Sequence, residues 1–264
     1  MGGSHVAAAR LPPVCVLAGG LGTRLGERVR DTPKPLLEVA GEPFLVHQLR
    51  QLARQGAREV VMCVGYRGER IVERIGEEQF GVQIAYSHDD PGLNGTLGAI
   101  RKALPLLGER FLVLYGDAYL RIDYRAAAHA WRLSGCSALM TVMRNEGRWE
   151  TSNAIYESGR VVGYDKREPT AAMRWIDYGL GGLEARALAA ISEDENDLSA
   201  LYRLLARRGQ LCGFVAKRRF YEIGTPAALA EAEAFLSRRL QAGGQIRKTA
   251  APFAPRRPDS RRGS

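Results

Sequence analysis

The chain lacks the sequence features of a membrane, secreted or metal-thiolate protein. No apolar run approaches the roughly 18 residues that a membrane-spanning helix needs. Residues 1–13 lack the apolar centre of a signal peptide, so we expect a cytoplasmic protein. The four cysteines, Cys15, Cys63, Cys136 and Cys212, form no C-x-x-C pair and have no histidine at metal-ligand spacing. The sequence therefore indicates cysteines that act as small apolar side chains, without a redox or zinc site.

Most of the chain also lacks an excess of charge. The net charge is +9, but residues 238–264 contain eight Arg or Lys and only Asp259 as an acid, so this segment carries +7 and the rest about +2. Because the segment is rich in Gly, Pro, Ala and Ser, we expect residues 240–264 to form a basic, disordered tail. Residues 1–12 are expected to be a disordered N-terminus. A weak polyanion-binding arm is the alternative for the tail, but no specific nucleic-acid binding is predicted.

The body of the chain contains no internal repeat of 20–50 residues and alternates strands with helices. In the first half, strands are expected at 14–18, 59–64, 82–87 and 111–115, and helices at 44–55, 69–77, 95–107 and 123–134. In the second half, shorter strands are expected at 137–143, 153–157, 160–165 and 211–216, an extended stretch at 173–183, and helices at 198–207 and 227–239. This order predicts one α/β, Rossmann-like domain over residues 13–239, with a mainly parallel central sheet and helices on both faces.

A glycine-rich loop follows the first strand, with the sequence Leu17-Ala-Gly-Gly-Leu-Gly-Thr-Arg-Leu25, and Pro33-Lys34-Pro35 comes soon after it. Glycine lets backbone N–H groups approach a ligand closely, and the cations Arg24 and Lys34 imply that this ligand is an anion such as phosphate. A Walker A loop is excluded because no Lys-Ser or Lys-Thr follows the glycines. A dinucleotide-binding loop is excluded because Leu25 stands at its third glycine position and the second strand ends without an acid.

This loop and five later segments resemble the signature of the sugar-1-phosphate nucleotidyltransferases. The later segments keep the family's order over most of residues 14–235: Gly65-Tyr66, Gly95-Thr-Leu-Gly-Ala99, Gly116-Asp117, Tyr164-Asp-Lys166 and Tyr221-Glu-Ile-Gly-Thr-Pro226. Within the family, the chain most resembles the guanylyltransferases of D-glycero-α-D-manno-heptose 1-phosphate. The resemblance implies a nucleotidyltransferase domain with a sugar-binding subregion in its second half. It also implies transfer of a nucleotidyl group from a nucleoside triphosphate to a sugar 1-phosphate, with release of pyrophosphate.

The resemblance assigns three residues to catalysis and others to the nucleotide. Arg24 would clamp phosphate oxygens, and Lys34 would place a positive charge beside the α-phosphate. Asp117 would hold Mg²⁺ together with Glu222, which stands where the family has an aspartate. A surface lysine and a surface acid at a strand end are the alternatives for Lys34 and Glu222. The residues expected around the nucleotide are Leu17, Ala18, Gly19, Gly20, Gly22, Thr23, Asn94, Gly95 and Thr96.

Four residues are implied on the sugar side, and here the chain departs most from the family. Lys166 would bind the sugar phosphate, while Asp177 and Gly179 would hold sugar hydroxyls. Asn153 stands where a Tyr-Gly pair is usual, Asp177 stands where an Asn is common, and Asp165 replaces the usual Glu before the lysine. These departures leave the identity of the sugar open.

Several alternatives follow from the same residues. GTP and a heptose 1-phosphate are the expected substrates, but the residues do not separate guanine from thymine, uracil or cytosine. A hexose-1-phosphate nucleotidyltransferase that uses UTP, CTP or dTTP is therefore an alternative, as is an enzyme acting on a non-sugar phosphate. A catalytically inactive nucleotide sensor is a third, although such a protein would have no need of Arg24, Lys34, Asp117 and Lys166 together. No membrane partner is expected, and a homo-oligomer stays open.

Overall fold

The computed structural model describes residues 10–20, 22, 24–26, 31–89 and 95–244. Four strands from the first half lie side by side and parallel: β7 (Arg110–Tyr115), β1 (Val14–Leu17), β4 (Glu59–Val64) and β6 (Val82–His88). Each is expected from its apolar run, and each lies within a residue or so of its predicted bounds. Because all four run in the same direction, their carboxyl ends share one edge of the sheet, where open α/β sheets bind ligands.

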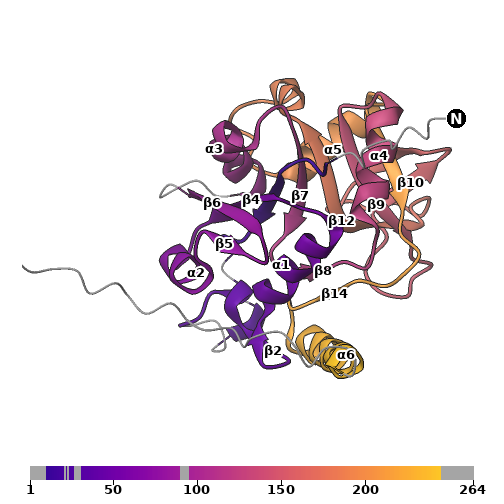
Figure 1. The fold of residues 1–264 in the computed structure, drawn as a ribbon. Helices are drawn as coiled ribbons and strands as arrows, with labels where there is room; N and C mark the ends of the chain where they lie inside the picture. The colour runs from indigo at the N-terminus through magenta and orange to yellow at the C-terminus, as the bar shows by residue number, and fades with distance from the viewer. Residues whose placement is uncertain (1–9, 21, 23, 27–30, 90–94, 245–264) are drawn as a thin grey trace, which may run out of the picture.

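The second half extends this sheet with strands of mixed direction. These are β9 (Ala138–Arg144), β10 (Ala154–Glu157), β11 (Arg160–Tyr164), β12 (Trp175–Glu184) and β13 (Leu211–Val215), and β5 (Glu78–Gln79) closes the other side. The order is β10-β11-β13-β9-β12-β7-β1-β4-β6-β5. Figure 1 shows β6, β4, β7, β12, β9 and β10 following one another across the molecule. Because β12 is antiparallel to both β7 and β9, and β5 is antiparallel to β6, the expected parallel arrangement holds for β7, β1, β4 and β6 but not for the whole sheet.

Helices cover both faces of the sheet, as expected. One face carries α1 (Phe44–Gln55), α2 (Gly68–Ile75) and α4 (Tyr124–Ser134), and the other carries α3 (Thr96–Leu107) and α5 (Leu198–Arg207). In β1 the side chains alternate between the two cores: Val14 and Val16 join the first, and Cys15 joins the second. A strand that is covered on both faces needs apolar residues at consecutive positions, which explains the unbroken apolar run.

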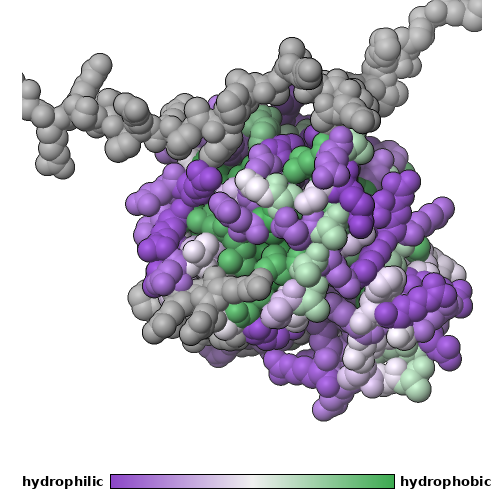
Figure 2. Space-filling view, turned by 90° about the horizontal axis from the view of Figure 1, so that it is seen from below, coloured by the Kyte–Doolittle hydropathy of each residue, from purple (hydrophilic) through white to green (hydrophobic). Residues whose placement is uncertain are grey.

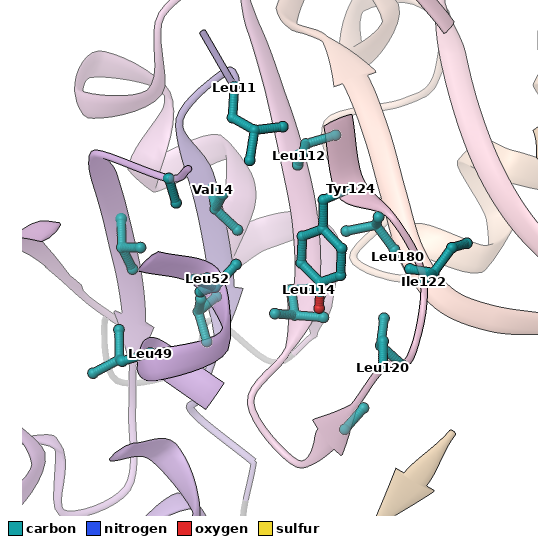
Figure 3. Close-up of a cluster of buried hydrophobic side chains, with 14 of the residues drawn as sticks. Leu11, Val14, Leu49, Leu52, Leu112, Leu114, Leu120, Ile122, Tyr124 and Leu180 are labelled. Carbon is teal, nitrogen blue, oxygen red and sulfur yellow. The ribbon is translucent and has the colours of Figure 1, made fainter. Parts of the chain in front are cut away.

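The first core contains leucines from several elements together with Tyr124 (Figure 3). Leu11 packs into this core with 6% of its surface exposed, so the prediction of disorder over residues 1–12 is wrong at Leu11. The reason is that Leu11 precedes β1 closely enough for its side chain to reach the apolar face below α1.

The view from below in Figure 2 shows apolar residues also gathered on the surface, within a border of hydrophilic ones. Such an area is often a binding face.

The last helix, α6 (Pro226–Gly244), lies beside β14 (Tyr221–Glu222) and β2 (Glu38–Val39) at one end of the molecule (Figure 1). The remaining short elements are β3 (Glu42–Pro43), β8 (Ala118–Tyr119) and the 3-10 helices η2 (Lys34–Leu36) and η3 (Ala185–Ala190). Since α6 continues to Gly244, residues 240–244 are helical, and the expectation that the disordered tail begins at residue 240 is wrong there. None of the helices among the described residues is long and apolar enough to cross a membrane.

Candidate active site

A cavity of about 370 Å³ opens at the carboxyl edge of the parallel strands. It is lined by nine of the residues that the sequence predicts for the nucleotide and for catalysis: Leu17, Ala18, Gly19, Gly20, Gly22, Lys34, Gly95, Thr96 and Asp117. The carboxyl ends of β1 and β7 bring the glycine loop and Asp117 together, because these two strands are hydrogen-bonded neighbours. Of the remaining nucleotide residues, Thr23 and Asn94 lie outside the described residues.

Glycine is favoured at position 19 because the Asp89 carboxylate and the Gly65 backbone occupy the space that a side chain would need. A Cβ atom at Gly19 would lie 2.6 Å from Asp89 Oδ2 and 3.1 Å from the Gly65 nitrogen. By contrast, a Cβ atom at Gly20 would meet nothing within 4 Å. Asp89 lines the cavity and was missed from the sequence, although its place directly after β6 puts it at the same edge as Asp117.

Gly95 closes the cavity where the N-termini of α3 and α5 meet. Its φ of +131° belongs to the region that favours glycine, and a Cβ atom there would lie 2.3 Å from the Asn196 carbonyl oxygen. That carbonyl accepts a hydrogen bond from the Leu97 N–H (2.9 Å), and the Thr96 hydroxyl accepts one from the Leu198 N–H (2.9 Å). The second half of the chain therefore fixes the segment that was expected beside the base and ribose.

Lys34 and Asp117 form an ion pair at the edge of the cavity. Pro33 and Pro35 flank the lysine and hold it in η2, and only 10% of its side chain is exposed. This burial does not fit a surface lysine in a proline-rich turn. The Asp117 carboxylate is 31% exposed and faces the same space.

Glu222 approaches Asp117 because β14 pairs with β8, which follows Asp117 directly. Glu222 lies opposite Ala118 in this small sheet, and the Ile223 N–H donates to the Asp117 carbonyl (3.1 Å). Burial raises the pKa of the Glu222 carboxyl above its ordinary value, and the negative charges of Glu150 and Asp117 raise it further. A carboxyl with a raised pKa beside a second carboxylate is suited to receive a cation.

Arg24 lies on the same side as Glu222, next to the cavity but outside its lining. A Cβ atom at Gly224 would lie 3.2 Å from Glu222 Oε1 and 3.4 Å from Arg24 Nη2, so both side chains approach the same glycine. The positive charges of Arg24 and Lys34 partly offset the rise in the Glu222 pKa. The predicted catalytic residues and the second predicted metal ligand are therefore gathered in one place.

The protein atoms at this point supply only part of the coordination shell that a hard divalent cation needs. Asp117 and Glu222 supply carboxylate oxygens, the ligands that Mg²⁺ prefers. Within the described ranges, no three or more His, Cys, Asp or Glu side chains are grouped so that they alone could hold a metal ion. Mg²⁺ commonly takes one or two carboxylates and completes its shell with substrate phosphates and water. The residues present fit that pattern.

The residues expected on the sugar side meet at the Asp177 carboxylate. Asp177 Oδ2 lies 3.1 Å from Lys166 Nζ and accepts a hydrogen bond from the Tyr164 hydroxyl (3.2 Å), while Oδ1 accepts from the Gly179 N–H (3.0 Å). Asn153 Oδ1 accepts from the Asp177 N–H (2.9 Å). The Asp177 side chain is only 6% exposed, and both of its oxygens are engaged with protein donors. In this arrangement Asp177 positions Lys166.

Lys166 is linked to the first cavity through Tyr115. Its Nζ lies 5.5 Å from the centre of the Tyr115 ring, and Tyr115 lines the cavity directly before Gly116. Burial alone would lower the pKa of Lys166, but the adjacent Asp177 carboxylate raises it above its ordinary value, so the ammonium stays charged. Tyr115 was missed from the sequence, where it was assigned only to the strand.

Asp165, which stands where the family has a Glu, is held by protein donors. Its Oδ1 accepts from the N–H groups of Arg167 (2.8 Å) and Glu168 (3.0 Å), and its Oδ2 accepts from Arg203 (3.0 Å). These bonds lower the pKa of Asp165 to about 2. Asp165 therefore fixes the turn after β11.

Comparisons with known proteins identify the family of the chain. The model of the family described as MobA-like NTP transferase domain matches residues 14–242. The chain is 42% identical over 114 residues to N-acetylmuramate alpha-1-phosphate uridylyltransferase of Neisseria meningitidis (42% of this chain, 49% of the relative). It is 40% identical over 108 residues to D-glycero-alpha-D-manno-heptose 1-phosphate guanylyltransferase of Campylobacter jejuni (41% of this chain, 48% of the relative). The chain thus spans about half the length of these curated relatives.

The fold also matches solved structures. Superposition on HddC of Yersinia pseudotuberculosis, solved in complex with GMP-PN, gives a TM-score of 0.70 at 24% identity and covers 86% of this chain and 100% of HddC. At that identity the match shows a shared fold. The sequence-based prediction of a nucleotidyltransferase fold is confirmed.

Proposed function

This chain belongs to the MobA-like NTP transferase family, and from that membership we propose that it transfers a nucleotidyl group from a nucleoside triphosphate to a sugar 1-phosphate. The products would be a nucleoside diphosphate sugar and pyrophosphate. GTP and D-glycero-α-D-manno-heptose 1-phosphate are the substrates proposed first, by similarity to the Campylobacter jejuni enzyme. UTP with N-acetylmuramate α-1-phosphate is the second pair, because the Neisseria meningitidis relative is equally similar.

The observation that carries the proposal is a pair of cations beside the cavity that Tyr115 lines. Lys34 belongs to the lining of this glycine-rich cavity and pairs with Asp117, and Lys166 Nζ lies 5.5 Å from the centre of the Tyr115 ring. A reaction between two phosphates needs both of them held close together and their charges neutralised. The arrangement offers one position for the triphosphate and one for the sugar phosphate.

In the proposed reaction, an oxygen of the sugar phosphate attacks the α-phosphorus of the triphosphate. The new P–O bond forms while the bond to the pyrophosphate oxygen breaks, and pyrophosphate leaves with that electron pair. Backbone N–H groups of the glycine loop and the Arg24 guanidinium would bind triphosphate oxygens. Lys34 would stabilise the negative charge that develops at the α-phosphate, and Asp117 holds its ammonium in place.

Asp117 and Glu222 would hold a divalent cation, for which we propose Mg²⁺. The cation supplies neutralisation of phosphate charge when it is bound. Lys166 would bind the sugar phosphate with an ammonium that Asp177 keeps oriented and charged. These residue roles rest on geometry and on similarity to the family.

The proposal is tested by pyrophosphate release from the purified full chain. GTP, UTP, CTP, dTTP and ATP would each be combined with the 1-phosphates of mannose, glucose, D-glycero-D-manno-heptose and N-acetylmuramate in the presence of Mg²⁺. We expect release with at least one pair and none when either substrate is omitted. Binding of nucleotides without release from any pair would instead support the inactive sensor.

A further inference from the structure

A second cavity, of about 310 Å³, has Glu222 in its lining. Its lining includes Arg148, Trp149, Glu150, Arg219 and Glu222. The sequence predicts no role for the loop that carries Trp149 and Glu150. Because Glu222 belongs to this lining, the cavity adjoins the proposed metal site.

The loop over this cavity is fixed by Asn145, which is fully buried. The Asn145 amide nitrogen donates to the Glu150 carbonyl oxygen and to Ser152 Oγ (3.1 Å), while its Oδ1 accepts from the Trp149 N–H (3.1 Å). A buried amide with three such bonds holds the loop in one conformation. Trp149 and Glu150 therefore form a preformed wall.

The loop that carries Glu150 leads from this cavity toward Lys166. Glu150 and Glu222 line the cavity together. Asn153, which follows the loop, accepts a hydrogen bond from the Asp177 N–H (2.9 Å), and Asp177 pairs with Lys166 (3.1 Å). The cavity therefore offers adjoining space to a sugar whose phosphate Lys166 would hold.

The charges around the cavity are unequal. Arg219 stacks on the Trp149 ring at 4.2 Å and forms an ion pair with Glu231, and Arg148 lies 3.2 Å from Glu146. Both cations therefore have a carboxylate partner. Among the described residues no ion pair involves Glu150 or Glu222, so the lining carries an excess of negative charge.

We propose that this cavity receives the sugar of the sugar 1-phosphate, and that Glu150 makes it select a neutral, hydroxyl-rich sugar over one that carries a carboxylate. The inference rests on the proposed function and narrows its substrate class. Carboxylate oxygens accept hydrogen bonds from sugar hydroxyls, and the exposed part of the Trp149 ring offers an apolar surface for the C–H face of the sugar. A carboxylate on the sugar would face Glu150 and Glu222, and like charges at such an interface are disfavoured.

The two relatives supply the decisive probes, because N-acetylmuramate carries a lactyl carboxylate and the heptose does not. We would measure kcat/KM of the full chain for D-glycero-α-D-manno-heptose 1-phosphate, mannose 1-phosphate and N-acetylmuramate α-1-phosphate, each with the best nucleotide. For Glu150→Gln, removal of the repulsion should raise kcat/KM for N-acetylmuramate α-1-phosphate about tenfold relative to the neutral sugars. For Trp149→Ala, KM for the neutral sugar 1-phosphate should rise about tenfold while KM for the nucleotide stays unchanged.

Matched control variants are available at exposed positions on helices away from this cavity. Glu73→Gln on α2 removes one exposed carboxylate, and Leu133→Ala on α4 removes one apolar side chain that is 71% exposed. Both should keep the wild-type ratios between sugars. Circular dichroism and thermal unfolding would show that the loop variants are folded.

Two outcomes would overturn the inference while the proposed function stands. One is a wild-type preference for N-acetylmuramate α-1-phosphate over the neutral sugars. The other is an unchanged ratio between sugars in both Glu150→Gln and Trp149→Ala. If the wild type releases no pyrophosphate with any sugar 1-phosphate, the proposed function itself fails. These results are distinct because the first two require an active wild-type enzyme.

Discussion

The Lys34 ammonium forms an ion pair with the Asp117 carboxylate, although 83 residues separate the two in the chain. Lys34 comes from the proline-flanked turn after the glycine loop, and Asp117 comes from the end of β7. The ion pair therefore brings together Pro33-Lys34-Pro35 and Gly116-Asp117, two motifs that point to phosphate chemistry. Since the Lys34 side chain is only 10% exposed, loss of Asp117 would leave a charge with little access to water, which is costly.

Asp117→Asn should therefore nearly abolish turnover. We expect pyrophosphate release to fall about 10²–10³-fold at saturating Mg²⁺, because one preorganised electrostatic group is lost from the transition state. Far-UV circular dichroism should remain unchanged. Glu157→Gln on β10 is the control for loss of an exposed carboxylate and should keep full activity. A wild-type rate in Asp117→Asn would remove Asp117 from the catalytic residues.

The sequence allowed the first half of the fold and much of the site to be predicted, because the chemistry there is local. An apolar run predicts the strand before Gly19 and the strand before Asp117, and parallel strands place their carboxyl ends together. Asp89 and Tyr115 follow from the same rule and could have been included.

Several contacts in the site depend on pairings that no local pattern encodes. Glu222 reaches Asp117 through a two-residue pairing between β14 and β8, which is too short to show a periodicity. The wall formed by Trp149 and Glu150 depends on a single buried amide, Asn145. The pairing of the buried Asp177 carboxylate with Lys166 likewise joins a residue of β12 to one just after β11 and follows from no local pattern, while the contact of Asp177 with the sugar stays a prediction.

Glu222→Gln should remove the pH dependence that the Glu222 carboxyl adds to the stability of the protein. Burial raises the pKa of the Glu222 carboxyl, so the folded state binds its proton more tightly than the unfolded state does. The stabilisation from this group is complete below the unfolded pKa and is lost as the pH rises through the folded pKa. Without metal, the variant, which stays neutral, should have a Tm about 2 °C above the wild type at pH 8 and an equal Tm near pH 3.

Addition of Mg²⁺ at pH 8 should then favour the wild type. A cation that binds only the folded state raises its stability, and the variant lacks one of the two proposed carboxylate ligands. Differential scanning fluorimetry with and without a chelator measures both effects. An identical rise of Tm in the two proteins would exclude Glu222 as a metal ligand.

Gly19→Ala and Gly20→Ala should have different effects although the positions are adjacent. At Gly19 the new Cβ atom would lie 2.6 Å from Asp89 Oδ2 and 3.1 Å from the Gly65 nitrogen. The Asp89 carboxylate and the Gly65 backbone must therefore both shift, and we expect Tm to fall by about 4–8 °C, corresponding to roughly 2 kcal/mol. At Gly20 no atom lies within 4 Å, so Tm should stay within about 1 °C of the wild type. If the Gly20 backbone contacts the triphosphate, KM for the nucleotide should be the only measured parameter that changes in Gly20→Ala. Equal loss of Tm in both variants would contradict the close approach at Gly19.

Lys166→Met should separate the two phosphate positions. Methionine keeps an unbranched, flexible side chain but removes the ammonium, so KM for the sugar 1-phosphate should rise by about 10²-fold while KM for the nucleotide stays within about twofold. Lys166→Arg should restore part of the affinity, because it keeps the charge with a different geometry. Asp177→Asn should give a smaller rise of the same KM, since Lys166 would remain charged but lose the carboxylate that orients it. Steady-state kinetics with each substrate varied in turn measure all three variants, and a rise of the nucleotide KM in Lys166→Met would place Lys166 on the triphosphate instead.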